Sequence, residues 1–267
     1  MTTPLHPDRA PGPADHRAAV ATETARFVAA LDGADLTTPV PACPGWTLAD
    51  LVRHTGSVQR WFSVLLRGRV QEPPRSRDVD LRLPDGADGW PGWLTASAAE
   101  AADAFAATGP DVPMYAWGAD QHARFWARRM LFETLVHRTD AERALRLDSR
   151  VDRALALDGI DEFLVNLPFA GIFAPRVAEL RGTGETVRFH ATDGDPDGPG
   201  DWWVRLRPDG FGLDPAARTA QAADATVRGT AADLLLLLYG RLPHDAAAFT
   251  LDGDRELLAR WCANSAF

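Results

Sequence analysis

RRMLFETLVHRTDAERAL, residues 128–145, is the most informative segment of this chain. It contains no proline or glycine and consists mainly of residues that favour helices, so it predicts the centre of a helix from about Asp120 to Leu147. Glu133 and His137 are four residues apart and therefore share one face of that helix. The same face carries Trp126, Met130 and Ala141. Because an apolar stripe of this kind packs inward, the segment predicts a carboxylate and an imidazole inside a helical bundle.

A second predicted helix, residues 47–68, contributes another imidazole. Thr47 is a typical helix cap, and Asp50 stands three residues later, where a capping box usually has Glu or Gln. His54 occupies a position on a stripe that is otherwise apolar. The other members of that stripe are Leu51, Val58, Trp61, Phe62 and Leu65. This imidazole is therefore predicted to face the same interior as the carboxylate and the imidazole described above.

The chain is predicted to be a two-domain α+β protein. Helical patterns over residues 16–33 and 93–108 complete a four-helix bundle that occupies residues 16–148, after a flexible tail over residues 1–15. From residue 149 to 267 the pattern changes to a small α/β domain. In that domain we expect helices over 151–169, 231–242 and 251–267, and strands over 185–192, 201–215 and 225–230.

Composition excludes several classes of function. A hydrophobic content of 46% is typical of a globular protein. The formal net charge of −9 argues against a general nucleic-acid binder, which needs a basic face. No apolar run is long enough to cross a bilayer and the N-terminus lacks the pattern of a signal peptide, so we expect no membrane partner and a cytoplasmic location. All 28 basic residues are Arg, which excludes a lysine Schiff base and the P-loop lysine.

Cysteine chemistry is not expected to carry the function. The chain has two cysteines, Cys43 and Cys262, which are too few for a disulfide framework or a cysteine-based zinc finger. Cys43 precedes the helix that carries His54. Nothing nearby in the sequence favours its thiolate, so a packing role is the natural interpretation.

The three polar side chains, His54, Glu133 and His137, suggest a metal centre. An unpaired buried carboxylate is costly, and a divalent metal would compensate the carboxylate and both imidazoles together. Two imidazoles and one carboxylate are suitable zinc ligands, and three protein ligands leave a position open for catalysis. Two alternatives stay open at this point. Glu133 and His137 can form a hydrogen-bonded pair, and His122 is a weaker rival ligand almost three turns before Glu133.

Three motifs resemble one known family. PACPGWTLADLVRHTGSVQRW, residues 41–61, resembles the N-terminal signature of the mycothiol-dependent maleylpyruvate isomerase family. The segment 128–145 resembles that family's later E-x-x-x-H-R-x-D motif, and LLLLLYGRLP, residues 234–243, resembles its C-terminal LLLLWGR segment, with Tyr239 at the aromatic position. The matches occur in the family's order and span nearly the whole chain after the tail.

This resemblance implies a DinB-like four-helix bundle followed by a small α/β domain. It also implies a site for zinc, or another divalent metal, carried by His54, Glu133 and His137, with mycothiol as the thiol cosubstrate. These are the residues that helical spacing brings together. Arg241, in the third motif, is a candidate catalytic residue because an arginine suits a carboxylate on the substrate or cofactor, although a surface or interdomain ion pair is an alternative.

The implied chemistry begins with a metal-activated thiolate that attacks an electrophilic small molecule. Addition to an activated alkene, rotation about the former double bond and departure of the thiol would be isomerisation, whereas a thiolate that stays attached would make the protein a transferase. Two other functions stay open. One is a hydrolase that uses zinc-bound water, and the other is a non-catalytic protein that binds a small ligand. Near the centre, Trp46 is interpreted as an anchor of the helix start or a ligand contact, and Asp140 as a partner of a metal ligand, a cap or a surface ion pair.

Overall fold

The computed structural model describes residues 13–72, 79–195, 198–216 and 222–266, so most of the tail predicted over residues 1–15 lies outside the described residues. The chain divides into two compact units, one within Pro11–Arg150 and one within Val151–Phe267, and each is described by itself. Helices build the first unit, and a sheet with helices builds the second. This arrangement confirms the predicted fold class.

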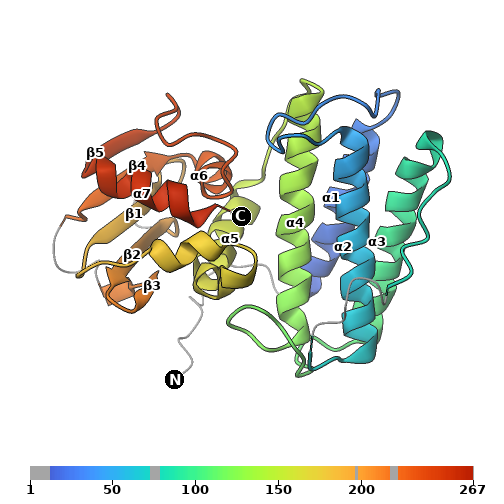
Figure 1. Ribbon diagram of the computed structural model, residues 1–267, viewed down its shortest axis with the longest axis horizontal. Helices are drawn as coiled ribbons and strands as arrows, with labels where there is room; N and C mark the ends of the chain where they lie inside the picture. Colours follow the sequence, from blue (N-terminus) through green and yellow to red (C-terminus); the bar gives the residue numbers. More distant parts are fainter. Residues whose placement is uncertain (1–12, 73–78, 196–197, 217–221, 267) are drawn as a thin grey trace. The chain divides into compact units, whose positions relative to one another are not determined.

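Four helices form the first unit and run alongside one another in Figure 1. They are α1 (Pro13–Ala30), α2 (Leu48–Gly68), α3 (Trp90–Ala107) and α4 (Ala123–Ala144), and a short 3-10 helix η2 (Ala87–Gly89) precedes α3. Helix α1 packs mainly on α4, and α2 packs mainly on α3. Helix α1 begins before His16 and α3 begins before Trp93, so each starts earlier than predicted, while α4 is shorter than predicted at both ends.

The start of α2 has the predicted capping box. The Thr47 side chain accepts a hydrogen bond from the Asp50 backbone N–H, and the Asp50 carboxylate accepts one from the Thr47 backbone N–H at 2.9 Å. The helix ends at Gly68, after which Arg69 adopts a left-handed conformation with φ of 43°. These caps set both ends of the helix by satisfying terminal backbone groups.

A buried ion-pair network joins α1 to α4. Arg138 is fully buried, and its Nε atom lies 2.8 Å from Oε2 of Glu23 while its Nη1 atom lies 2.6 Å from Oε2 of Glu142. Both carboxylates are buried as well. Buried charges are tolerated when they are paired in this way, so Arg138 has a structural role beside the polar stripe of α4.

The second unit is built on a five-stranded mixed sheet with the order β3-β2-β1-β4-β5. The central pair, β1 and β4, is parallel and the other neighbours are antiparallel. The strands are β1 (Thr186–Ala191), β2 (Asp201–Arg207), β3 (Gly210–Leu213), β4 (Ala225–Gly229) and β5 (Thr250–Gly253). The helices are α5 (Arg153–Asn166), α6 (Ala231–Leu238) and α7 (Arg255–Ser265), with 3-10 turns η3 (Leu167–Ile172) and η4 (Pro175–Glu179) after α5.

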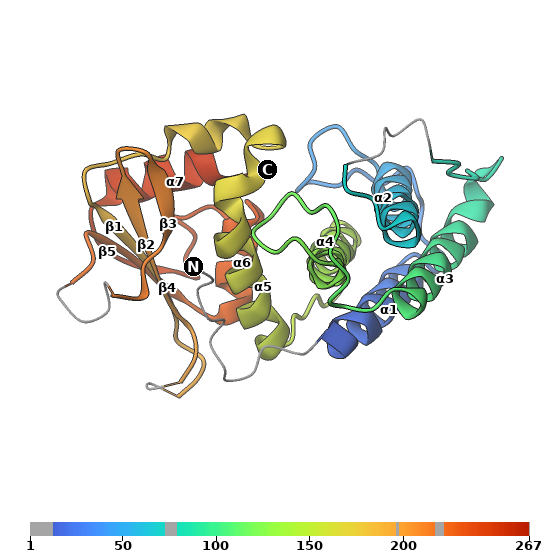
Figure 2. The same cartoon turned by 90° about the horizontal axis from the view of Figure 1, so that it is seen from below.

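Alternation along β1 separates the core from the outer face of the sheet. Val187 and Phe189 are fully buried, whereas the intervening Arg188 is partly exposed. Trp261 of α7 packs with its ring centroid 5.8 Å from that of Phe189. Figure 2 shows α7 lying along the sheet. The core of this unit therefore lies between the sheet and its helices.

The predicted last helix, residues 251–267, is wrong over its first residues. Thr250–Gly253 forms the edge strand β5, and α7 begins only at Arg255. Gly253 adopts a left-handed conformation with φ of 78°, which ends the strand. The Asp254 side chain then caps α7 by accepting hydrogen bonds from two backbone N–H groups. The Asp-Gly-Asp sequence is therefore a strand end and a cap, not the first turn of a helix. No helix among the described residues has the length and apolar character that a membrane span requires.

Candidate metal centre

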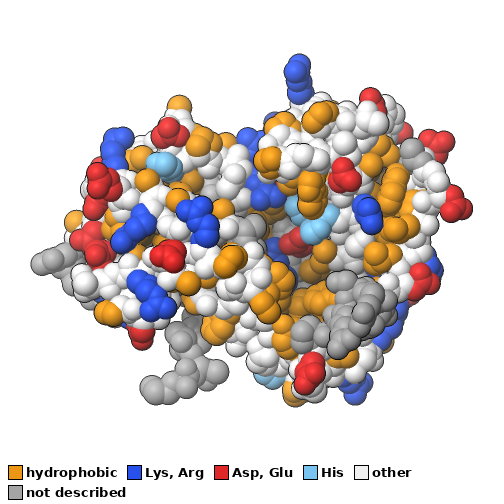
Figure 3. All heavy atoms as spheres, in the orientation of Figure 1, with side chains coloured by type: hydrophobic (Ala, Val, Ile, Leu, Met, Phe, Trp, Pro, Cys, Tyr) orange, Lys and Arg blue, Asp and Glu red, His pale blue; other side chains and the backbone are white. Residues whose placement is uncertain are grey.

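Three side chains from two helices of the first unit converge. His54 projects from α2, while Glu133 and His137 lie one turn apart on α4. Oε1 of Glu133 lies 2.9 Å from Nε2 of His54 and 3.3 Å from Nε2 of His137, and the three donor atoms all lie within 4.8 Å of one another. Figure 3 shows histidine side chains reaching the surface over the helical unit. The structure therefore brings together the three residues that the sequence selects.

Arg129 forms an ion pair with the second carboxylate oxygen of Glu133, Oε2. It lies one turn earlier on α4, and its Nη2 atom donates to Oε2 of Glu133 at 2.8 Å. The Arg129 side chain is 5% exposed, so the ion pair is shielded from water. This contact directs the other oxygen, Oε1, toward the two imidazoles.

Asp140 and Cys43 lie at the opposite edge of the His137 ring. Nδ1 of His137 is 3.1 Å from Oδ2 of Asp140, and Sγ of Cys43 is 3.7 Å from the same oxygen. Asp140 is 1% exposed, so it is neither a surface ion pair nor a helix cap. The contact of Cys43 was not predicted from the sequence, although its place in the motif that contains His54 was a signal. Cys43, His137 and Asp140 form a second group whose donor atoms lie within 4.8 Å of one another.

Trp46 packs beside both imidazoles. The ring centroid of Trp46 lies 5.1 Å from that of His54 and 6.3 Å from that of His137. The two imidazole centroids are 4.9 Å apart, with the rings nearly perpendicular. Trp46 thus forms one wall of the cluster, in addition to standing just before α2.

The cluster strongly perturbs its own acid–base equilibria. Burial alone would raise the pKa of Glu133, but hydrogen bonds from His137 and His54 and the charge of Arg129 outweigh burial and hold that pKa well below its usual value of 4.5. Burial alone would lower the pKa of His137, but hydrogen bonds with Asp140, Cys43 and Glu133 outweigh it and hold the pKa well above 6.5. Without a metal, the pair is therefore a carboxylate beside an imidazolium.

The donor set fits a zinc-like ion. Zinc takes imidazole nitrogen and carboxylate oxygen at about 2.0–2.2 Å, which places neighbouring ligand atoms about 3.3 Å apart in a tetrahedron. Glu133 Oε1 lies 2.9 and 3.3 Å from the two imidazole nitrogens, at hydrogen-bonding distance, so the three donor atoms are close enough for one ion to reach them all. The hydrogen bond between His137 Nδ1 and Asp140 is the outer contact that metal-bound histidines usually make.

The other two candidate residues, His122 and Arg241, do not belong to this group of donor atoms. His122 stands at the residue before α4 without capping the helix through its side chain, and its Nδ1 atom is 2.6 Å from Oδ1 of Asp120. Arg241 belongs to the second unit, where it follows α6 and its Nη1 atom donates to the backbone oxygen of Tyr239 at 2.6 Å. A catalytic role for Arg241 stays a prediction.

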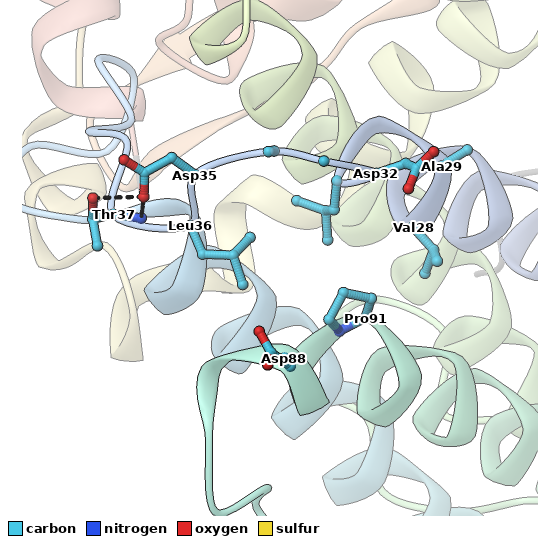
Figure 4. Close-up of a pocket in the computed structure, with 11 residues that line it drawn as sticks. Val28, Ala29, Asp32, Asp35, Leu36, Thr37, Asp88 and Pro91 are labelled. Atoms are coloured by element: carbon cyan, nitrogen blue, oxygen red, sulfur yellow. Dashed lines mark hydrogen bonds between the residues drawn. The ribbon is translucent and has the colours of Figure 1, made fainter.

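A separate pocket of about 760 Å³ lies where α1 ends and α3 begins. Figure 4 shows Asp32 and Asp88 at its edge, with Val28, Leu36 and Pro91 forming apolar parts of its wall. None of the three clustered residues lines this pocket.

The chain matches known protein families over most of its length. Two family models match it, the mycothiol maleylpyruvate isomerase N-terminal domain over residues 17–142 and the MDMPI C-terminal domain over residues 154–260. The chain belongs to the mycothiol-dependent maleylpyruvate isomerase family. The predicted resemblance is thereby confirmed, and the family is one of enzymes.

Two solved structures of a mycothiol-dependent maleylpyruvate isomerase share the fold. One is 13% identical in sequence, with a TM-score of 0.57, and the alignment covers 91% of this chain and 93% of that chain. The other is a histidine-to-alanine mutant, 12% identical, with a TM-score of 0.58 and the same coverage. At this identity the likeness supports the fold alone. No curated protein matches the chain at a significant level.

Proposed function

We propose that this chain is a metal-dependent isomerase or transferase that uses mycothiol on an electrophilic small molecule. The observation that supports the proposal best is the convergence of His54, Glu133 and His137 within 4.8 Å, in a chain that carries both domains of the maleylpyruvate isomerase family. These three residues would hold zinc or another divalent metal. A cytoplasmic location, where such thiols are kept reduced, is part of the proposal.

Each residue of the cluster has a defined task in this proposal. His54 and His137 offer their Nε2 atoms, and Glu133 offers Oε1 while Arg129 binds its other oxygen. Asp140 accepts a hydrogen bond from Nδ1–H of His137, which leaves the Nε2 lone pair for the metal. A zinc ion held there would lower the pKa of the thiol cosubstrate and so favour its thiolate at neutral pH.

Arg241 is proposed to bind a carboxylate of the substrate or of the thiol. A guanidinium group binds carboxylates through two parallel hydrogen bonds, which a single ammonium cannot do. Gly240 adopts a left-handed conformation with φ of 70°, so the chain turns sharply after α6 just before Arg241. This turn and the hydrogen bond to the Tyr239 carbonyl fix the position of the Arg241 side chain on its own unit.

The first test is the metal content of the purified protein beside two variants. His54→Ala removes a proposed ligand, whereas His122→Ala removes an imidazole that lies outside the cluster and serves as the matched control. We expect near-stoichiometric metal in the wild type and in the control, and its loss in His54→Ala. A wild type that binds no metal after zinc is supplied would overturn the metal-dependent mechanism and favour a non-catalytic ligand-binding protein.

The second test is thiol dependence. The metal-loaded protein is assayed on unsaturated and other electrophilic substrates, with mycothiol and without any thiol. Turnover should require the thiol. Turnover without a thiol would instead support a hydrolase that uses metal-bound water.

A further inference from the structure

The loop between α1 and α2 is built as a compact turn beside the proposed metal centre. The backbone N–H of Val40 donates to the Trp46 carbonyl at 2.9 Å, and the N–H of Leu48 donates to the Thr38 carbonyl at 3.0 Å. Gly45 adopts φ of 84°, which permits the tight reversal. Because backbone hydrogen bonds close both ends of the turn, the backbone positions of the residues between them are fixed.

Two side chains of this turn contact the histidine cluster from different directions. Cys43 hydrogen-bonds to Asp140 at the Nδ1 edge of His137 and also to His137 itself, while Trp46 packs beside the rings of both His54 and His137. The turn therefore contacts two of the three proposed ligands, although its own side chains supply none of them.

Cys43 acts on a carboxylate that is almost fully buried. Asp140 Oδ2 lies 3.1 Å from His137 Nδ1 and 3.7 Å from Cys43 Sγ. A thiol is a weak donor, but removing a donor from a buried carboxylate oxygen destabilises the folded protein. The Cys43 thiol thus completes the surroundings of the oxygen that orients His137.

Cys43 does not share the ion proposed at the first cluster. Its sulfur lies at the Nδ1 edge of His137, whereas Glu133 faces the Nε2 atom of the same ring. The two ring nitrogens are at different edges of the imidazole, so one ion cannot take both. This geometry places Cys43 behind the ligand and not beside the metal.

We infer that Cys43 and Trp46 are positioning residues, which clamp the imidazoles of His54 and His137 in the orientation that a metal requires. The inference rests on the proposed metal site. Cys43 acts by holding the carboxylate of Asp140 and by its own hydrogen bond with His137, and Trp46 acts by blocking rotation of the two rings. Removal of either contact leaves the ligands present but lets them reorient, so metal affinity falls while the helices persist.

The test measures zinc affinity by competition with a chelator. Cys43→Ala should weaken zinc binding about tenfold, at the lower end of the range for partners outside the ligand shell. Cys43→Ser keeps a donor toward Asp140 and should stay within about threefold of the wild type. Cys262→Ala is the matched control because Cys262 lies on α7 of the second unit, and it should leave the affinity unchanged.

Trp46 is tested with a parallel pair of variants. Trp46→Phe retains a ring beside the imidazoles and should bind zinc nearly as well as the wild type, whereas Trp46→Ala should bind it about tenfold more weakly. Trp90→Ala, on α3, is the control. Unchanged zinc affinity in both Cys43→Ala and Trp46→Ala would overturn the clamp.

Two spectroscopic measurements separate the clamp from its rivals. With cobalt in place of zinc, a thiolate-to-cobalt absorption band that disappears in Cys43→Ser would make Cys43 a ligand and overturn the inference. If the wild type binds no metal, the proposed function fails, and the Nδ1 proton of His137 then tests the clamp by itself. A sharp, slowly exchanging proton signal that broadens in Cys43→Ala supports the clamp, and its absence from the wild type refutes it.

Discussion

Arg129 and Glu133 lie one helical turn apart on α4, and the Nη2 atom of Arg129 is 2.8 Å from Oε2 of Glu133. The two oxygens of this carboxylate therefore have different partners. Oε2 pairs with the buried Arg129, and Oε1 contacts the imidazoles of His54 and His137. The carboxylate is thus held in place before any metal binds.

Replacement of Glu133 tests the ligand assignment directly. Glu133→Ala should weaken zinc binding by more than about 100-fold, beyond the range for outer partners, because it removes a donor atom. The helix content, measured by circular dichroism, should stay near that of the wild type because alanine favours helices. Full metal occupancy in Glu133→Ala would remove Glu133 from the ligand set.

Zinc affinity should rise with pH. The pKa of metal-free His137 is held well above 6.5, so zinc has to displace a proton from its Nε2 atom. Calorimetric titration in buffers of different ionisation enthalpy should show proton release on binding at neutral pH. Asp140→Asn removes a partner that raises the pKa of His137, so this variant should release fewer protons. Equal proton release in the wild type and Asp140→Asn would contradict the assignment.

The stability of the metal-free protein should depend on pH with a defined sign. His137 has a raised pKa in the folded state, so its contribution is complete below 6.5 and is lost as the pH rises through the raised pKa. Glu133 has a lowered pKa, so its contribution is present above 4.5 and is lost as the pH falls through the lowered pKa. The pair should therefore contribute most to the free energy of unfolding, as measured with urea, between pH 4.5 and pH 6.5. Glu133→Gln should flatten the profile, and a profile of unchanged shape would count against the coupling.

Arg138, the fully buried arginine of α4, should be important for the stability of the fold. Arg138→Met leaves Glu23 and Glu142 buried with their main partner removed, which should lower the free energy of unfolding by about 3–5 kcal/mol. Urea unfolding measures this loss. The variant that combines Arg138→Met with Glu23→Gln and Glu142→Gln should recover a large part of it, because the two buried carboxylate charges are gone and Arg26, which also pairs with them, is partly exposed to water. A single variant as stable as the wild type would show that the network contributes little.

Replacement of Arg241 should affect substrate binding but not metal binding. Arg241→Ala should reduce kcat/KM on a carboxylate substrate and leave zinc content unchanged, because Arg241 follows α6 in the second unit. Arg241→Lys should recover only part of the activity, since lysine keeps the charge but lacks the planar fork of donors. Identical kinetics in the wild type and Arg241→Ala would exclude Arg241 from the reaction.

Periodicity was sufficient to predict the cluster but not its surroundings. Glu133 and His137 are four apart on a helix, and His54 interrupts an apolar stripe, so helical geometry alone places them on inward faces. Cys43 and Trp46 lie in a loop, where side-chain direction depends on the hydrogen bonds of the turn and has no period. Their contacts with the cluster were therefore not predictable from spacing.

The errors in the fold have a similar physical origin. Thr250–Gly253 is a short edge strand whose pairing partner, β4, lies far away in the sequence, so its four residues carry no local signal strong enough to compete with the helix that follows. Asp140 was left open between three roles because helical spacing gives a residue's face but not its depth. Its burial depends on packing that α4 makes with the rest of the unit.

The whole centre and its proposed clamp come from two short stretches of chain, residues 43–54 and 129–140. Neither stretch includes any residue of the sheet unit. If Arg241 of the sheet unit binds substrate as proposed, mutations in that unit would change which molecules are accepted and leave the proposed metal ligands intact. Such a gene would acquire new substrates by changing one half of its coding sequence while selection preserved the other.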